Sequence, residues 1–221
     1  MSDMPEFLLE RLKRRRRLWS LDAEMLYKVS HPEKPIPDEV GFSRNEDEPR
    51  FSIIIPVRND SEYIAGCLES LAAQRCDDYE IIFVDAGCRD DSLHQIKNFF
   101  SEHEELQERH RVFSLEKEDL PLDDDSEFVL DLLGRISIYG EYVFGMKPQD
   151  RFYTEKALAV ISAHLDDIDN PDTILLPYSG YGLQDSGEEE AVSEENNHLR
   201  SICIRRAYLN SIRNGILGEK R

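Results

Sequence analysis

The sequence predicts an α/β fold in which a doubly wound, mostly parallel sheet is flanked by helices. The continuous apolar, β-branched run FSIIIPV at 51–57 is typical of a buried parallel strand, and YEIIFVDAG at 79–87 is expected to be a second buried strand. Each run is followed by a stretch whose apolar residues recur with helical spacing. Strands and helices that alternate in this way favour right-handed βαβ units. We therefore expect one such domain over residues 51–221.

The first half of this domain alternates regularly. The strand FSIIIPV at 51–57 is followed by a helix start at Asn59, and the apolar residues from Tyr63 to Ala72 share one helical face. The strand at 79–87 ends with an aspartate and a turn glycine. A second helix is expected at 89–100, and 110–117 can form a third strand.

The second half continues the alternation less regularly. In order along the chain, we expect a helix at 125–140 with a break at Gly134, a strand at 141–146, a helix at 154–165, a strand at 172–178, an acidic and mobile surface loop at 182–197, a strand at 199–206 and a short helix after it.

The N-terminal segment is basic, in contrast to the rest of the chain. Residues 11–17 read RLKRRRR, and the apolar residues around them recur at near-helical spacing, which predicts an amphipathic helix within residues 1–27. Residues 28–50 contain four prolines and many charges and are expected to be a linker. Two hypotheses remain for the helix. It packs on its own acidic domain, or it lies on an anionic membrane surface.

The charge of the whole chain excludes some functions. The 46 acidic residues exceed the 27 basic ones, so the formal net charge is −19, and extensive nucleic-acid binding is not expected. No apolar run reaches the length of a membrane span, and the N-terminus lacks the pattern of a secretory signal. The four cysteines have no metal-site spacing, which favours reduced thiols and a cytoplasmic protein, peripheral to the inner face of the membrane if the helix binds lipid.

Two loops are the candidate site. Ligands of open parallel sheets bind beyond the carboxyl ends of the strands, and here these ends lead into 56–60 and 85–90. Each loop carries a carboxylate and precedes a helix, whose free N–H groups can hold phosphate. The alternative is that these aspartates only cap helices. The sequence contains neither GxGxxG nor GxxxxGK[ST], which argues against the common dinucleotide and P-loop sites.

The stretch SIIIPVRNDSEYIAGCLESLAAQRCDDYEIIFVDAGCRDDSL resembles the N-terminal half of family 2 glycosyltransferases of the GT-A fold. Further along, GEYVFGMKPQDRFYTEKAL resembles the segment that carries the DxD motif of these enzymes, so the resemblance spans about 51–166. It implies transfer of a sugar from a nucleoside-diphosphate sugar to an acceptor hydroxyl in glycan synthesis, generally with inversion. The implied nucleotide-sugar-binding residues are Pro56, Val57, Arg58, Asp60, Asp85, Lys147 and Asp150.

The sequence departs from the family pattern where a metal is expected. The family implies Mg²⁺ or Mn²⁺ on the DxD carboxylates, but this chain reads Lys147-Pro148-Gln149-Asp150, and a protonated lysine is not a metal ligand. We therefore assign no metal ligand. Three hypotheses follow: Lys147, with Arg151, replaces the metal as a fixed positive charge; the motif has been lost; or the ligands lie within the acidic triplet 123–125.

The catalytic apparatus is also incomplete. A second aspartate usual after the second strand is Ala86 here, and Glu219 is the only acidic residue after the last expected helix. We assign no catalytic residue from the sequence. The alternative to an enzyme is a non-catalytic glycosyltransferase domain that binds a nucleotide or another protein, and a further possibility is that the chain is part of a longer polypeptide.

Overall fold

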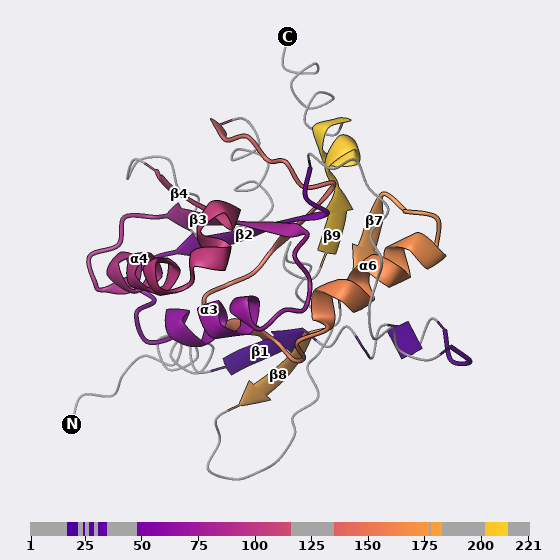
Figure 1. Cartoon of the computed structure of the whole chain (residues 1–221), viewed down its shortest axis with the longest axis horizontal. Coiled ribbons are helices and arrows are strands. Elements are labelled where there is room, and N and C mark those ends of the chain that lie inside the picture. Colours follow the sequence, from indigo (N-terminus) through magenta and orange to yellow (C-terminus); the bar gives the residue numbers. More distant parts are fainter. Residues whose placement is uncertain are drawn as a thin grey trace, which may run out of the picture.

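A six-stranded mixed sheet forms the centre of the computed structural model (Figure 1). Its strand order is β4-β3-β2-β5-β9-β7, with parallel pairing from β4 to β5 and antiparallel pairing of β9 with both neighbours. The strands are β2 (Phe51–Val57), β3 (Tyr79–Asp85), β4 (His110–Ser114), β5 (Tyr142–Gly145), β7 (Thr173–Leu175) and β9 (Ile202–Arg205). The structure describes residues 17–21, 24, 27–28, 31–34, 48–115, 135–176, 178–182 and 202–211.

The central strands confirm the prediction from the apolar runs. Every residue of β3 is buried, and β2 is buried except for the half-buried Pro56. β-Branched residues pack well on a pleated surface covered from both sides. Alternate residues of these strands, such as Ile53 and Ile54, belong to two separate apolar clusters. The sheet therefore has a core on each face, as expected for an α/β fold.

Three helices cover one face of the sheet. They are α3 (Ile64–Ala72), α4 (Ser92–Glu102) and α6 (Ala157–Asp167), and a 3₁₀ helix, η1 (Glu104–Arg109), follows α4. α3 buries Ile64, Cys67, Leu68 and Leu71, the face expected from the sequence. It begins later than expected because the carbonyl of Asp60 first closes a turn with the N–H groups of Tyr63 and Ile64.

A smaller sheet corrects the prediction for the N-terminus. It has the order β6-β1-β8 and consists of β6 (Asp150–Phe152), β1 (Arg17–Leu21) and β8 (Tyr178–Gly182). The expected helix is therefore wrong for residues 17–21, which form a strand parallel to β6 and antiparallel to β8. Hydrogen bonds to two distant strands stabilise this conformation, and local periodicity carries no information about such partners. Residues 1–16 lie outside the described part of the chain.

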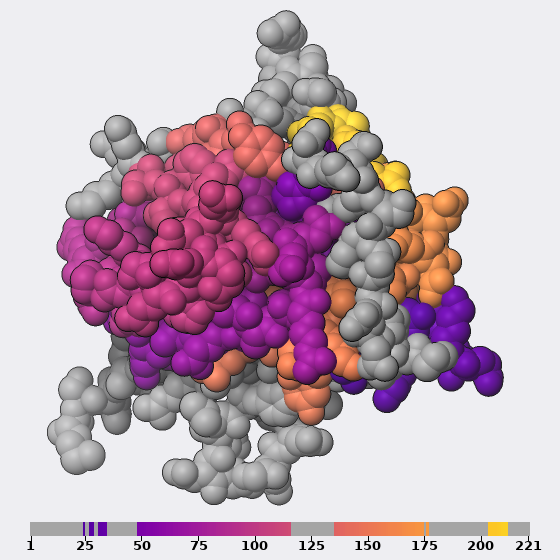
Figure 2. Space-filling view, in the orientation of Figure 1, coloured from indigo at the N-terminus to yellow at the C-terminus, as the bar shows by residue number. Residues whose placement is uncertain are grey.

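Other described residues of the N-terminal segment pack on α6 (Figure 2). The hydroxyl of Tyr27 donates to Asp167 at 3.1 Å, and the ammonium group of Lys34 lies 2.9 Å from the same carboxylate. The hydrogen bond from Lys34 is the main reason that the pKa of Asp167 is lowered. Tyr27 is only 4% exposed. This part of the expected linker is thus attached to the domain.

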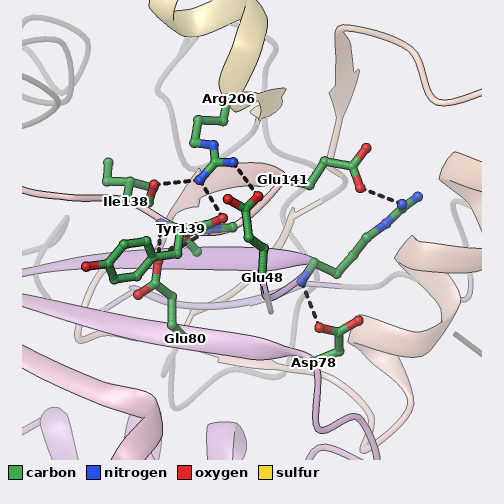
Figure 3. A network of polar contacts seen from close by, with 10 residues as sticks. Glu48, Asp78, Glu80, Ile138, Tyr139, Glu141 and Arg206 are labelled. Carbon is green, nitrogen blue, oxygen red and sulfur yellow. Dashed lines mark hydrogen bonds and ion pairs between the residues drawn. The ribbon is translucent and has the colours of Figure 1, made fainter. Parts of the chain in front are cut away.

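A group of charged side chains lies at the amino ends of the parallel strands (Figure 3). Arg50, just before β2, is buried, and its guanidinium group contacts Glu141 at 2.8 Å and Asp166 at 2.6 Å. Its backbone N–H donates to Asp78, just before β3, at 2.9 Å. These contacts fix the starts of β2, β3 and β5 relative to one another.

A second polar group holds the chain that leads into β5. Arg206 donates to the carbonyls of Ile138 and Tyr139 and pairs with Glu48 at 2.6 Å (Figure 3). Residues 136–140 are not helical, so the helix expected at 125–140 is wrong for this part. Its residues 125–134 lie outside the described chain, as do residues 183–197 of the expected acidic loop.

The described residues contain no helix with the length and apolar character needed to cross a membrane. The helix expected at 154–165 corresponds to α6, which begins and ends later, and the strands expected at 141–146 and 199–206 correspond to the shorter β5 and β9. The strand expected at 172–178 is divided, because β7 ends at Leu175 and Tyr178 begins β8 in the smaller sheet.

Candidate functional site

The two loops predicted to form the site lie against each other at the carboxyl ends of β2 and β3. The N–H of Ala86 donates to the carbonyl of Val57 at 2.9 Å, and the N–H of Arg89 donates to the side chain of Asn59 at 2.8 Å. The convergence follows from the parallel register of the strands, which pairs Val57 with Asp85. This edge of the sheet is where open α/β folds bind ligands.

Asp85 is held rigidly at the end of β3. It is 9% exposed, and its Oδ1 accepts hydrogen bonds from the N–H groups of Gly87 at 2.9 Å and Cys88 at 2.8 Å. Gly87 has a φ of 80°, a conformation that glycine adopts at little cost. The Oδ2 of Asp85 accepts a long hydrogen bond of 3.3 Å from the hydroxyl of Ser114, and the thiol of Cys88 also interacts with this carboxylate. Since a carboxylate oxygen accepts two hydrogen bonds, Oδ2 can accept one from a ligand.

Asp60 connects three parts of the site. Its Oδ2 accepts from the N–H of Arg58 at 2.7 Å, and its backbone N–H donates to the hydroxyl of Ser92 at 2.9 Å. Its Oδ1 accepts a hydrogen bond of 2.7 Å from the side-chain amide of Gln149. Gln149 was not predicted as a site residue, although its place in the altered DxD segment was a signal. Asp60 is therefore a connecting residue, and each of its carboxylate oxygens accepts a short hydrogen bond from within the site.

Asp90 fastens the second loop to the first. Its carboxylate accepts hydrogen bonds from the N–H of Ser61 at 3.0 Å and from the hydroxyl of Ser92 at 2.5 Å. Desolvation alone would raise the pKa of Asp90, but the hydrogen bonds from Ser92 and Ser61 outweigh it and hold this pKa well below its ordinary value of 3.8. Ionised Asp90 thus stabilises the contact between the two loops.

Asp90→Asn is expected to lower the free energy of unfolding at neutral pH, and the deficit should shrink in acid. The folded-state pKa is lowered, so the contribution of Asp90 is complete above its unfolded pKa, near 3.8, and is lost as the pH falls towards the folded value. Urea unfolding from pH 7 to pH 3 measures the difference. The control is Asp91→Asn, because Asp91 makes no capping hydrogen bond at the start of α4. A deficit that stays constant down to pH 3 would contradict this role.

The segment aligned with the DxD motif forms a tight turn between β5 and β6. Asp150 is fully buried; its Oδ2 accepts from the N–H of Lys147 at 2.7 Å, and its own N–H donates to the carbonyl of Lys147 at 2.8 Å. Asp150, predicted to touch the nucleotide sugar, is therefore placed to orient the turn. Lys147 is half-buried.

Val57, another residue predicted to bind the nucleotide sugar, is fully buried, and its carbonyl accepts the hydrogen bond from Ala86 that joins the two loops.

The residues present do not fit a divalent metal in the usual place. Mg²⁺ and Mn²⁺ prefer carboxylate oxygens, whereas the two DxD positions hold an ammonium group, Lys147, and an amide, Gln149, that is bound to Asp60. Within the described ranges, no three histidine, cysteine or acidic side chains form a cluster able to hold a metal. The acidic triplet 123–125 and Glu219 lie outside these ranges.

Cys88 is the one cysteine in the two loops, and its thiol lies 3.3 Å from the carbonyl of Val57. Burial raises the pKa of Cys88 to about 11, so the thiol stays protonated at neutral pH. Since the thiolate is the nucleophile of cysteine chemistry, this arrangement does not favour nucleophilic catalysis. All four cysteines are free in the structure.

The sheet, its helices and the loops at its carboxyl edge define an α/β protein of the GT-A type, the fold of nucleotide-diphospho-sugar transferases. The structure is similar to S. aureus TarS 1-349 in complex with UDP, with a TM-score of 0.52 and 22% identity over 74% of this chain and 48% of that chain. A structure of S. aureus TarS gives a TM-score of 0.53 and 19% identity over 73% of this chain and 29% of that chain.

Residues 52–119 match the family model "Glycosyl transferase family 2", in agreement with the resemblance seen in the sequence. Curated relatives include PGL/p-HBAD biosynthesis glycosyltransferases of Mycobacterium bovis (strain BCG / Pasteur 1173P2) and Mycobacterium tuberculosis (strain ATCC 25177 / H37Ra). Each is 45% identical over 53 residues, which is 24% of this chain and 20% of the relative. The matched residues thus span about a fifth of these relatives' length.

Proposed function

We propose that the chain binds a nucleoside-diphosphate sugar at the carboxyl edge of the sheet and takes part in transfer of the sugar to an acceptor hydroxyl. The observation that carries this proposal is the joined pair of loops after β2 and β3, with Asp85 held at their junction. The family 2 match over both loops supports it. The relatives, which are PGL/p-HBAD biosynthesis glycosyltransferases, also support it, as does the similar structure of S. aureus TarS 1-349 in complex with UDP.

The residues can be given roles on this basis. The free acceptor capacity of Asp85 suits a base N–H or a ribose hydroxyl, and Pro56 and Val57 form the strand end beside it. Arg58 and Lys147 supply positive charge for the diphosphate, while Asp60 and Asp150 hold the loops that carry them. In the reaction, the acceptor oxygen bonds to the anomeric carbon, the bond to the diphosphate oxygen breaks, and the acceptor proton leaves to a base. Fixed positive charge stabilises the departing diphosphate.

A non-catalytic nucleotide-binding or protein-interaction domain is the second candidate. It is favoured by the turn at Lys147 and Gln149, where amide and ammonium groups replace the carboxylates and Gln149 is bound to Asp60. The test uses a donor whose sugar is radiolabelled. Release of this sugar from the bound donor is measured in the presence of candidate acceptors and separates an enzyme from a binding domain. Sustained release identifies an enzyme.

Nucleotide binding is expected to raise the thermal stability of the chain. A nucleotide at about 100 times its Kd should stabilise the fold by about 2.7 kcal/mol. Thermal unfolding is recorded with UDP, GDP, CDP and dTDP, each with Mn²⁺ and with EDTA, and the matching nucleoside monophosphates are the controls. If none of the four diphosphates shifts the unfolding temperature under either condition, the proposed site is wrong.

A contact of the basic run 11–17 with anionic lipid is proposed from the charge of this run alone. Co-sedimentation with phosphatidylserine vesicles at low and high salt tests it, and absence of binding at low salt rejects it. The strand conformation of Arg17–Leu21 limits any lipid-bound helix to the residues before it.

A further inference from the structure

The arginines of the described chain are divided into two groups by their partners. In a chain with a formal net charge of −19, an exposed guanidinium group readily finds a carboxylate. Most described arginines have done so, in the ion pairs Arg50–Glu141, Arg50–Asp166, Arg75–Glu155, Arg109–Asp77, Arg111–Glu80, Arg205–Asp172 and Arg206–Glu48. Paired arginine is therefore the rule over most of the fold.

No ion pair with a described residue is formed by Arg58, Arg89 or Arg151, and all three lie in or next to the segments of the candidate site. Arg58 follows β2, Arg89 follows β3, and Arg151 lies in β6, directly after the turn at the DxD position. All three are exposed. Exposed guanidinium groups without a described carboxylate partner can attract an anionic ligand.

The segments that carry these arginines are tied to one another. The N–H of Arg89 donates to the side chain of Asn59, next to Arg58, at 2.8 Å. The side chain of Gln149 reaches Asp60 at 2.7 Å and so joins the turn before Arg151 to the same loop. The three backbones are thus fixed relative to each other before any ligand binds, which lowers the entropic cost of binding.

Gly66 makes room for one of these side chains. A Cβ built at this position would overlap the guanidinium group of Arg151. Because Gly66 has no side chain, Arg151 can lie against the first turn of α3. The φ of Gly66 is not positive, and a glycine in a helix interior costs about 0.5–1 kcal/mol relative to alanine. Space for Arg151 is a physical reason for a glycine here.

We infer that Arg58, Arg89 and Arg151 bind the diphosphate of the nucleotide sugar directly, in place of a carboxylate-bound divalent metal. This inference rests on the proposed function, since it names the groups that recognise the same ligand. A guanidinium fork matches two phosphate oxygens and remains charged at any relevant pH. Direct binding by arginine also explains why the DxD position lacks carboxylates, because no metal is then needed to balance the charge on the leaving diphosphate.

The test is isothermal titration of the full chain in EDTA with the best-binding nucleoside diphosphate, its monophosphate and its nucleoside. Affinity is expected to rise with each phosphate. Arg58→Ala, Arg89→Ala and Arg151→Ala should each raise the Kd of the diphosphate about tenfold or more and leave that of the nucleoside unchanged. Arg75→Ala, which removes an exposed arginine beyond the other end of α3, is the matched control and should change neither.

The outcomes separate this inference from the proposed function. If the nucleoside binds but the diphosphate gains affinity only with Mn²⁺, or if the three variants bind the diphosphate like the wild type, direct arginine recognition is wrong and the nucleotide site stands. If the wild type binds neither nucleoside nor diphosphate, with or without Mn²⁺, both are wrong. Circular dichroism verifies that each variant is folded, and Arg89→Lys, which keeps the charge without the fork, should lie between wild type and Arg89→Ala.

Discussion

Glu80→Ala is expected to lower the free energy of unfolding by about 3 kcal/mol, because it removes the carboxylate that several buried donors share. The Glu80 side chain is 9% exposed and forms an ion pair with Arg111. Its Oε1 also accepts from the hydroxyl of Ser52 at 2.5 Å and from the N–H of Tyr139 at 2.8 Å. Alanine would leave these donors unpaired in the interior, and each buried donor without a partner costs about 1–3 kcal/mol.

Urea unfolding followed by circular dichroism measures this loss. Glu80→Gln retains an acceptor oxygen without the charge and should lie between the wild type and Glu80→Ala. The control is Glu155→Ala, because Glu155 pairs with Arg75 at the surface, where the two side chains are 46% and 61% exposed. Such exposed pairs contribute about 0–1 kcal/mol. Equal losses in Glu80→Ala and Glu155→Ala would show that the buried group contributes nothing beyond a surface pair.

Asp85→Asn is expected to raise the Kd of the bound nucleotide about tenfold to hundredfold with little change in stability. The asparagine keeps an Oδ1 that accepts from Gly87 and Cys88, so the loop is retained. It replaces Oδ2 by an amide nitrogen, which cannot accept a hydrogen bond. A hydrogen bond to a charged group contributes about 1.5–3 kcal/mol, and about 1.4 kcal/mol is tenfold in affinity.

Isothermal titration with the diphosphate that stabilises the wild type provides the measurement. Asp91→Asn removes a carboxylate from the same loop that makes no capping hydrogen bond, and should bind like the wild type. Unchanged affinity in Asp85→Asn would remove Asp85 from the site and leave it as a residue that only shapes the loop.

The two edges of the main sheet have different roles. At the amino ends of β2, β3 and β5, charged groups satisfy one another, as around Arg50 and Glu80. At the carboxyl ends, Asp85 keeps acceptor capacity, and three arginines have no described carboxylate partner. Paired charges stabilise an edge, whereas an edge that must bind a ligand retains unpaired groups. This division supports placing the nucleotide site where the family resemblance puts it.

Local pattern was sufficient for the elements whose burial gives the sequence a regular apolar pattern. The apolar runs of β2 and β3 and the one-sided face of α3 are visible in the sequence, because burial on both faces or on one stripe dictates residue type with a fixed period. β1 was missed because the apolar residues around it recur at near-helical spacing, and its pairing with β6 and β8 is not visible in local periodicity. β6 and β8, only a few residues long, have no pattern of their own.

The sequence by itself determined that two carboxylate-bearing loops follow adjacent buried strands, and that lysine and glutamine occupy the positions of a metal-binding pair. Only the tertiary structure decided which of these side chains are still available to a ligand. Asp60 and Asp150 turned out to be engaged by Gln149 and the backbone of Lys147, whereas Asp85 retains an accepting oxygen. The physical reason is that the sequence gives the type of each residue directly, whereas the hydrogen-bond partners of a side chain depend on which segments meet in space.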